Sequence, residues 1–190
     1  MSLIPAFELG LLNAWIFILP MIIISFFGSR ILGKRGSAEV STLSKKMKTA
    51  SNLYFAVTLL LYAYSIFLPL RIDTTWFVIG LLIYLPFVFF LITGLLNFAS
   101  TPVDEPVTKG VYSISRNPMY VGDFFVNISI GIACLSWVFL VVAIVNFLFF
   151  RYYVVVVEEP FLEEKYGDTY RKYKNRTSRW IGIPKSEEKD

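Results

Sequence analysis

The chain has 190 residues, of which 56% are hydrophobic and 17% are charged, and its formal net charge at pH 7 is +4. Soluble domains are usually about 45–50% apolar and about 25% charged, so this composition excludes an ordinary soluble domain and indicates an integral membrane protein. Histidine is absent and Cys134 is the single cysteine, which excludes a histidine base, histidine metal ligands and an intrachain disulfide.

Long apolar runs set the expected architecture. They are continuous rather than alternating, which predicts an all-α integral membrane helix bundle, and the length predicts one domain over residues 1–190. In chain order, residues 11–27, 53–70 and 75–98 are expected to be three N-terminal spans. Pro20 interrupts the first and Pro86 kinks the third. Residues 28–49 form a basic loop, and the short joint at 71–74 makes the second and third spans antiparallel.

The fourth apolar run, residues 124–157, contains Arg151 as its one charged residue. A straight helix of this length would be about 51 Å long, whereas the hydrocarbon core of a bilayer is about 30 Å thick. The run therefore either extends past the membrane or folds into a hairpin, with Ser136 in the turn region. The first arm of such a hairpin, residues 123–135, would be only about 20 Å long.

The distribution of basic residues favours the hairpin. With the N-terminus outside, a hairpin leaves 17 of the 18 Lys and Arg residues on the cytoplasmic side and Arg71 alone outside. A single crossing would leave 8 inside and 10 outside, contrary to the usual excess of basic residues in cytoplasmic loops. We therefore expect about five transmembrane helices, with the last two as a tight pair and the C-terminus in the cytoplasm.

Such a hairpin brings two polar clusters to the same side of the membrane. The first cluster, before the apolar run, consists of Gly110, Tyr112, Arg116, Asn117, Pro118, Met119, Tyr120 and Gly122. The second, after it, consists of Glu158, Glu159, Tyr166, Gly167, Tyr170 and Tyr173. Charged groups at the membrane boundary on converging helix ends are typical of a functional site.

Taken singly, these residues also have purely structural explanations. Tyr112 and Tyr120 fit an interfacial aromatic belt, and Pro118 fits the first turn of a helix. An apolar stripe at helical spacing in the tail favours packing or surface binding over ligand contact. Its members are Leu162, Tyr166, Tyr170 and Tyr173. The order and spacing of the whole set favour a site.

In that order and spacing, the two clusters resemble the isoprenylcysteine carboxyl methyltransferase family and its phospholipid N-methyltransferase relatives, over residues 97–180. The family pattern is Gly-x-Tyr, Arg-His-Pro-x-Tyr-x-Gly, an apolar hairpin, Glu-Glu, and Phe/Tyr-Gly-x-x-Tyr-x-x-Tyr. Length and helix plan resemble the small prokaryotic and archaeal members. The resemblance implies a single methyltransferase domain, in which residues 99–183 form a cofactor-binding loop, the hairpin and a cytoplasmic tail.

The resemblance also implies S-adenosylmethionine as methyl donor, with S-adenosylhomocysteine as product. The chain has no Gly-x-Gly-x-x-Gly motif after a strand, consistent with binding outside a Rossmann domain. The resemblance places at the cofactor Asn97, Asp104, Glu105, Pro106, Val107, Tyr112, Asn117, Pro118, Met119, Tyr120 and Glu158. The family histidine is Asn117 here. Because an amide forms hydrogen bonds without titrating, we expect Asn117 to position the cofactor rather than act as a base.

The acceptor is expected to carry a carboxylate. A carboxylate is already ionised at neutral pH and needs no base, but it needs a cation in a dry pocket, which Arg116 or Arg151 would supply while Glu158 closes the site. A protonated lipid amine must first lose a proton. This favours O-methylation of an isoprenylcysteine-like carboxylate over N-methylation of a phosphatidylethanolamine-type lipid.

The expected partners are a lipophilic substrate that enters from the bilayer and membrane lipids, with neither nucleic acid nor metal. Two other functions stay open. A sterol-reductase-like enzyme would bind NADPH, for which this chain is small. A non-enzymatic scaffold or transporter would tolerate substitution of Arg116 or Tyr120, although the inverted repeats typical of transporters are not visible.

Overall fold

A computed structural model describes residues 7–24, 26 and 45–184 of the chain. These residues form helices and no strands, which confirms the all-α prediction for this part of the chain. In chain order the helices are Trp15–Ile24, α2 (Lys45–Ser65), α3 (Thr75–Ser100), the 3₁₀ turn η1 (Gly110–Ser113), α4 (Pro118–Ala133), α5 (Trp137–Tyr153), the π-helical turn η2 (Val154–Glu158) and α6 (Glu159–Arg176).

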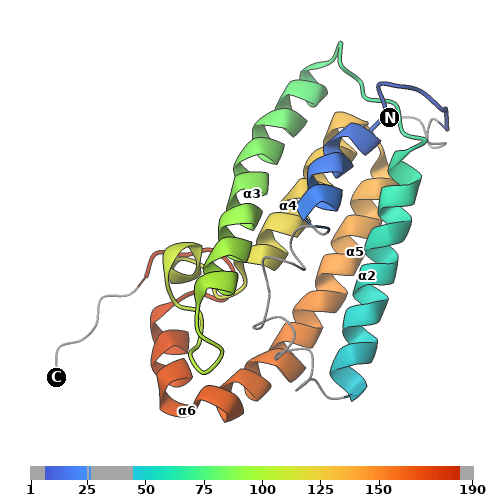
Figure 1. Cartoon of the computed structure of the whole chain (residues 1–190). Helices are drawn as coiled ribbons and strands as arrows, with labels where there is room; N and C mark the ends of the chain where they lie inside the picture. Colours follow the sequence, from blue (N-terminus) through green and yellow to red (C-terminus); the bar gives the residue numbers. More distant parts are fainter. Residues whose placement is uncertain (1–6, 25, 27–44, 185–190) are drawn as a thin grey trace.

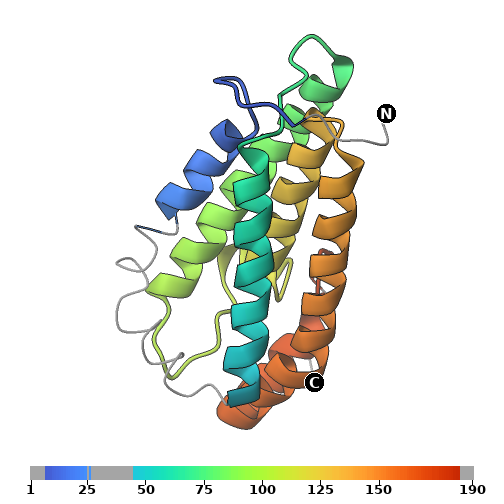
Figure 2. The ribbon, with the colours of Figure 1, turned by 90° about the vertical axis from the view of Figure 1, so that its right-hand side faces the viewer.

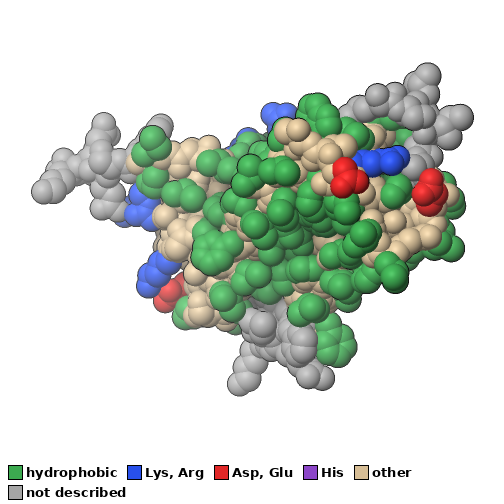
Figure 3. Space-filling model, turned by 90° about the horizontal axis from the view of Figure 1, so that it is seen from above, with side chains coloured by type: hydrophobic (Ala, Val, Ile, Leu, Met, Phe, Trp, Pro, Cys, Tyr) green, Lys and Arg blue, Asp and Glu red, His purple; other side chains and the backbone are tan. Residues whose placement is uncertain are grey.

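Four helices, α2 to α5, run alongside one another, and the helix Trp15–Ile24 packs at one end of this bundle (Figures 1 and 2). At the opposite end, α6 bends away from α5 and the loop between α3 and α4 folds over it (Figure 1). The end that carries the loop between α2 and α3 is covered mainly by hydrophobic side chains, with a few charged groups near its rim (Figure 3).

A buried apolar core joins the helices. Ile18, Leu61, Ile130 and Phe139 come from four different helices and are at most 3% exposed. Hydrogen bonds also join the helices: the Tyr84 hydroxyl donates to the carbonyl of Phe17 at 2.6 Å. Within the bundle, the Tyr54 hydroxyl donates to the Asp123 carboxylate and so connects α2 to α4.

The predicted hairpin is confirmed. Three residues separate α4 from α5; Leu135 takes a left-handed φ of +53°, and the Ser136 hydroxyl caps α5 by accepting from the amide of Phe139 at 3.3 Å. The arms differ in length from the expected ones. The first begins at Pro118, because a proline is favoured in the first turn, and the second continues through η2 into α6.

The predicted spans need correction at their ends. The second span was expected at 53–70, but α2 begins at Lys45 and ends at Ser65, so residues 45–49 are helical rather than part of a loop. The third span, expected at 75–98, is α3 at Thr75–Ser100. The first shows a helix over Trp15–Ile24, while residues 25 and 27 of that span and 28–44 of the loop lie outside the described residues.

Within the described chain, two helices are long and apolar enough to cross a membrane, Thr75–Ser100 and the continuous Trp137–Arg176. In each helix, only 28% of the most apolar 18-residue stretch is buried inside the molecule. A core helix of a soluble protein would bury most of its apolar surface, so the exposed remainder supports a membrane environment. Helices Trp15–Ile24 and Pro118–Ala133 are shorter, and the count of five membrane-crossing helices stays a prediction.

Glycines let α3 and α4 approach closely. A Cβ atom placed on Gly122 would lie 2.9 Å from Leu91 Cβ and 3.2 Å from the carbonyl oxygen of Phe87. A Cβ atom on Gly80 would lie 2.8 Å from both Ala133 Cβ and the carbonyl oxygen of Ser129. Small residues are what allow membrane helices to pack backbone to backbone. Gly122 of the first cluster therefore has a packing role.

We expect Gly122→Ala to separate α3 from α4 and to destabilise the protein by about 1–3 kcal/mol, as other overpacking substitutions do. Thermal unfolding of the purified protein in detergent measures the effect. Gly94→Ala, on α3, is the matched control, because its new methyl group would lie 3.2 Å from the flexible Met119 side chain and 3.7 Å from the nearest backbone atom. An equal loss of stability in both variants would contradict close backbone packing at Gly122.

Candidate functional site

The two polar clusters meet at the end of the bundle that carries α6. They enclose a cavity of about 200 Å³, whose walls come from α2, the end of α3, the loop before α4, the start of α4, η2 and α6. In its wall the Tyr120 hydroxyl, from the first cluster, donates to the Glu158 carboxylate, from the second, at 3.3 Å. The expectation that the hairpin brings the clusters together is confirmed.

Aromatic rings of the helix bundle pack against Tyr120. The ring of Tyr120 lies 4.3 Å from that of Phe150, centroid to centroid, and Phe150 lies 4.2 Å from the ring of Tyr54. Glu158 is the last residue of the π-helical turn η2, and such turns within α-helices are frequent at functional sites. Packing and helix geometry thus fix Tyr120 and Glu158 on one side of the cavity.

Glu159 holds the wall together. Its side chain is 4% exposed and lies between two arginines. Arg116 Nη2 approaches Glu159 Oε1 at 3.0 Å, and Arg179 donates through Nε to Oε1 at 2.8 Å and through Nη2 to Oε2 at 2.9 Å. These hydrogen bonds to Glu159 raise the pKa of Arg179. One buried carboxylate therefore connects α6 to the loop before α4 and to the C-terminal segment.

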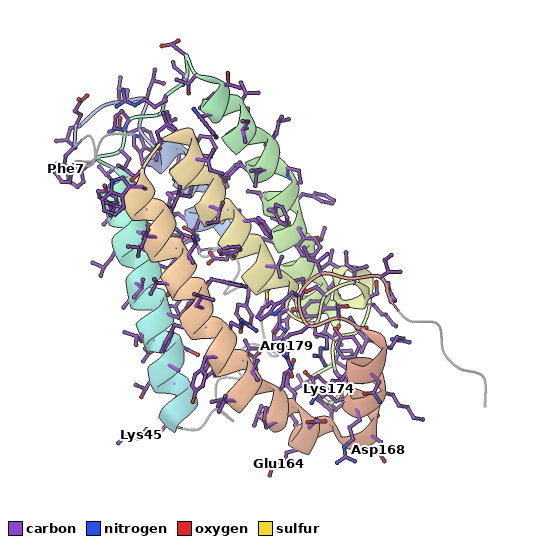
Figure 4. All side chains as sticks on the ribbon, turned by 180° about the vertical axis from the view of Figure 1, so that it is seen from behind. Phe7, Lys45, Glu164, Asp168, Lys174 and Arg179 are labelled. Atoms are coloured by element: carbon purple, nitrogen blue, oxygen red, sulfur yellow. The ribbon has the colours of Figure 1, made fainter. Side chains whose placement is uncertain are left out.

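That C-terminal segment, residues 177–182, forms a strap beside the cavity. The amide of Arg116 donates to the carbonyl of Ser178 at 2.9 Å, and the amide of Gly182 donates to the carbonyl of Ile114 at 3.0 Å. Asn117 Nδ2 donates to the carbonyl of Arg179 at 3.1 Å. Figure 4 shows Arg179 and Lys174 between α6 and the bundle, with Asp168 at the outer turn of α6.

The position of Asn117 gives its amide a structural role. A neutral histidine also donates one ring N–H, but it becomes positively charged when it is protonated, whereas an amide stays neutral at every pH. The Asn117 side chain both lines the cavity and fixes the strap. Its predicted contact with a cofactor stays a prediction.

The predicted site residues divide into two groups. Eight line the cavity: Pro106, Val107, Tyr112, Arg116, Asn117, Met119, Tyr120 and Glu158. Five are placed elsewhere: Asn97, Asp104, Glu105, Pro118 and Arg151. Asp104 and Glu105 are exposed on the loop, and Pro118 is buried at the first position of α4.

Asn97 supports the cavity from outside. Its Oδ1 accepts from the amide of Val111 at 3.1 Å. Gly110 has a φ of +61°, and a Cβ atom there would lie 2.2 Å from Asn97 Oδ1. Both observations explain the glycine: the left-handed backbone and the close amide leave no room for a side chain. Asn97 thus orients the turn that carries Tyr112.

Arg151 points away from the cavity. It is exposed and lines a separate groove with Phe124, Phe147 and Trp180. The two arginines expected near Glu158 are therefore not equivalent. Arg116 lies in the cavity wall, and Arg151 lies on the outer face of the hairpin.

The stripe on α6 was expected to pack or to lie on the surface, and its residues also line the cavity. They are Leu162, Tyr166, Tyr170 and Tyr173. The stripe also packs, as expected: the Tyr173 hydroxyl donates to the carbonyl of Tyr112 at 2.7 Å. Burial raises the pKa of Tyr170, as does the nearby Glu159, while Arg116 lowers it. Burial also raises the pKa of Tyr173, so both phenols are neutral donors at pH 7.

Gly167 turns this stripe towards the cavity. Its φ of +56° and ψ of −133° break α6 into two helical pieces. No atom lies within 4 Å of a Cβ atom placed there, so the glycine is required by backbone conformation rather than by space. Further lining residues, Ser51 and Tyr153 among them, lie in helices whose sequences carry no polar pattern that could have identified them.

The cavity offers chemistry for both signs of charge. Glu158 and the tyrosine rings suit a cationic group, through a carboxylate and the negative faces of the rings. Arg116 suits an anionic group: its Nε is buried and has no hydrogen-bond partner in the described part of the chain, although its Nη atoms bond Glu159 and the carbonyl of Lys174. Buried polar groups are rarely left unpaired. The free Nε therefore points to a ligand.

We expect Glu159→Gln to destabilise the protein by about 3 kcal/mol, because it leaves Arg116 buried without its counter-charge. Chemical denaturation followed by circular dichroism measures the loss. Glu163→Gln is the control, since the pair of Glu163 with Lys174 is about 30% exposed on both sides and is worth about 0–1 kcal/mol. A Glu159 variant as stable as the Glu163 variant would contradict this role.

Comparison with known proteins gives one family. Residues 76–169 match the sequence model of the phospholipid methyltransferase family. No curated protein matches the chain. The matched segment runs from the start of α3 into α6 and includes η1, the hairpin and the Tyr120–Glu158 pair. Residues 76–169 are therefore similar to a phospholipid methyltransferase domain, and this likeness indicates a membrane methyltransferase.

Proposed function

We propose that this protein is an S-adenosylmethionine-dependent membrane methyltransferase that acts on a lipophilic acceptor in the cavity between the two clusters. The observation that carries the proposal is the cavity itself. It combines Glu158, Tyr120 and the unpaired Nε of Arg116 at the end of an apolar helix bundle. A polar pocket at that place suits a reaction between a water-soluble donor and a membrane-embedded acceptor.

The lining fits the donor. S-adenosylmethionine supplies an electrophilic methyl group on a positively charged sulfonium. Glu158 and the ring of Tyr120 would hold the cationic sulfonium. The rings of Tyr112, Tyr170 and their aromatic neighbours provide flat surfaces on which the adenine ring of the donor can stack. Because the cavity is about 200 Å³ and ligand pockets usually measure about 300–1,000 Å³, its walls must open on binding.

The proposed acceptor is the carboxylate of an isoprenylcysteine-like compound. The carboxylate is ionised at neutral pH, so the chain need not provide a base. Among the described residues that line the cavity, Arg116 is the one with a positive charge. Its Nε would orient the carboxylate, while Glu159 keeps the guanidinium in place.

The second candidate acceptor is the amine of a phospholipid. Two observations favour it: the family match is to phospholipid methyltransferases, and Arg116 is already paired with Glu159, so Glu158 contributes a carboxylate to the cavity. Glu158 would accept the proton that an ammonium group must lose before attack. Methyl transfer to a farnesylcysteine analogue or to phosphatidylethanolamine distinguishes the two acceptors.

The proposed orientation follows from charge. Placing the α6 end in the cytoplasm puts 12 of the 13 Lys and Arg residues in the described part of the chain on that side, with Arg71 at the other end, in agreement with the positive-inside rule. The donor would then reach the cavity from the cytoplasm, while the lipophilic part of the acceptor would reach it from the bilayer.

We expect Glu158→Gln to weaken binding of S-adenosylmethionine at least about tenfold, because its sulfonium loses a charge-assisted contact worth about 1.5–3 kcal/mol. Isothermal titration of the purified protein measures this affinity, with Glu163→Gln as the control. Unchanged affinity in the Glu158 variant would remove this residue from the donor site.

Methyl transfer from labelled S-adenosylmethionine should occur to a farnesylcysteine analogue and yield a base-labile methyl ester. Its rate should be nearly constant above neutral pH, because the acceptor is ionised throughout. A parallel reaction with phosphatidylethanolamine tests the second candidate. Label in base-stable product, with a rate that rises with pH, would instead establish N-methylation.

A further inference from the structure

Arg151 has no part in the cavity, yet it is the one charge in the apolar run 124–157. It lies in the last turn of α5, and its exposed side chain has no partner among the described residues. A guanidinium on an apolar, membrane-facing surface is costly unless it reaches a counter-charge or the lipid headgroups. Its surroundings therefore identify what it pairs with.

Those surroundings form an open groove of about 460 Å³ on the outer face of the hairpin. Aromatic side chains from both arms line it: Phe124 and Phe125 from α4 and Phe147 from α5. Trp180 of the strap lies 5.1 Å from the ring of Phe147, centroid to centroid, and closes one side. Figure 4 looks onto the face where α4 and α5 run side by side, with no other helix in front of them.

We propose that this groove binds a phospholipid of the surrounding bilayer, with the lipid phosphate on Arg151 and an acyl chain along the phenylalanine rings. Arginine is well suited to phosphate, because its planar guanidinium can donate two parallel hydrogen bonds. Tryptophan is enriched at the level of the headgroups, where one part of its ring is apolar and the N–H stays hydrated. Arg151 thus matches the phosphate of a phospholipid, Trp180 matches the level of its headgroup, and the apolar groove matches an acyl chain.

A second copy of the chain fits the groove less well. Homodimers usually have two-fold symmetry, so that each patch meets its own copy. A two-fold contact centred on the groove would bring two Arg151 side chains together without a described acid to neutralise them. A lipid phosphate supplies the missing negative charge.

The site would be distinct from the methyltransferase cavity. The residues that line the groove and those that line the cavity do not overlap. The strap connects the two, because Trp180 lies at the groove while the adjacent Arg179 bonds Glu159 in the cavity wall. A lipid in the groove would therefore steady the strap that borders the cavity.

The test uses the full chain in bilayer nanodiscs that contain a small fraction of brominated lipid, which quenches nearby tryptophan. The signal of Trp180 is the difference between the protein and its Trp180→Phe variant, since the chain has four tryptophans. Brominated phosphatidylglycerol should associate with this site about fivefold more strongly than brominated phosphatidylcholine, the factor expected from one basic residue at a membrane surface.

Arg151→Gln should abolish the preference for the anionic lipid, and Arg151→Lys should retain part of it. Arg171→Gln is the control, because Arg171 is an exposed arginine of α6 paired with Asp168; it should leave the preference unchanged. Equal quenching by the two lipids, or a preference that persists in Arg151→Gln, would overturn the proposal. Absence of quenching by either lipid would also overturn it, since the groove would then be covered by protein.

Discussion

The site depends on the ion pairs that the buried carboxylate of Glu159 forms with two arginines. The carboxylate is almost fully buried and bonds Arg116 from the loop before α4 and Arg179 from the C-terminal strap. Removing ions from water is costly, and the cost is recovered only where geometry is good and hydrogen bonds are complete. The bidentate contact with Arg179 meets that requirement. Through this carboxylate, three segments far apart in sequence become one wall.

The membrane bundle supplies what this wall needs. The hairpin of α4 and α5 returns the chain to the side from which it started, and close glycine contacts keep α3 against α4. The bend through η2 and the break at Gly167 then turn α6 back towards the loop. Each of these features is local, and together they bring Glu158 and Tyr120 into the wall of one cavity.

The hairpin and the meeting of the two clusters could be predicted, because charge distribution and helix length are global properties of the sequence. The individual contacts could not. Whether Arg151 faces the cavity or the outer groove depends on how α5 is rotated by packing, and Asn97 bonds the amide of Val111 rather than lining the cavity. Arg179 and Trp180 lie in a strap without periodicity, so no pattern indicated their roles.

In the function we propose, the two clusters form one site for one ligand. The most direct measurement is photo-crosslinking of labelled S-adenosylmethionine to the purified protein, followed by mass-spectrometric mapping of the modified peptides. We expect adducts both within residues 112–120 and within residues 158–173, and both sets should be lost when unlabelled S-adenosylhomocysteine is added. Adducts confined to one cluster, or found elsewhere in the chain, would contradict it.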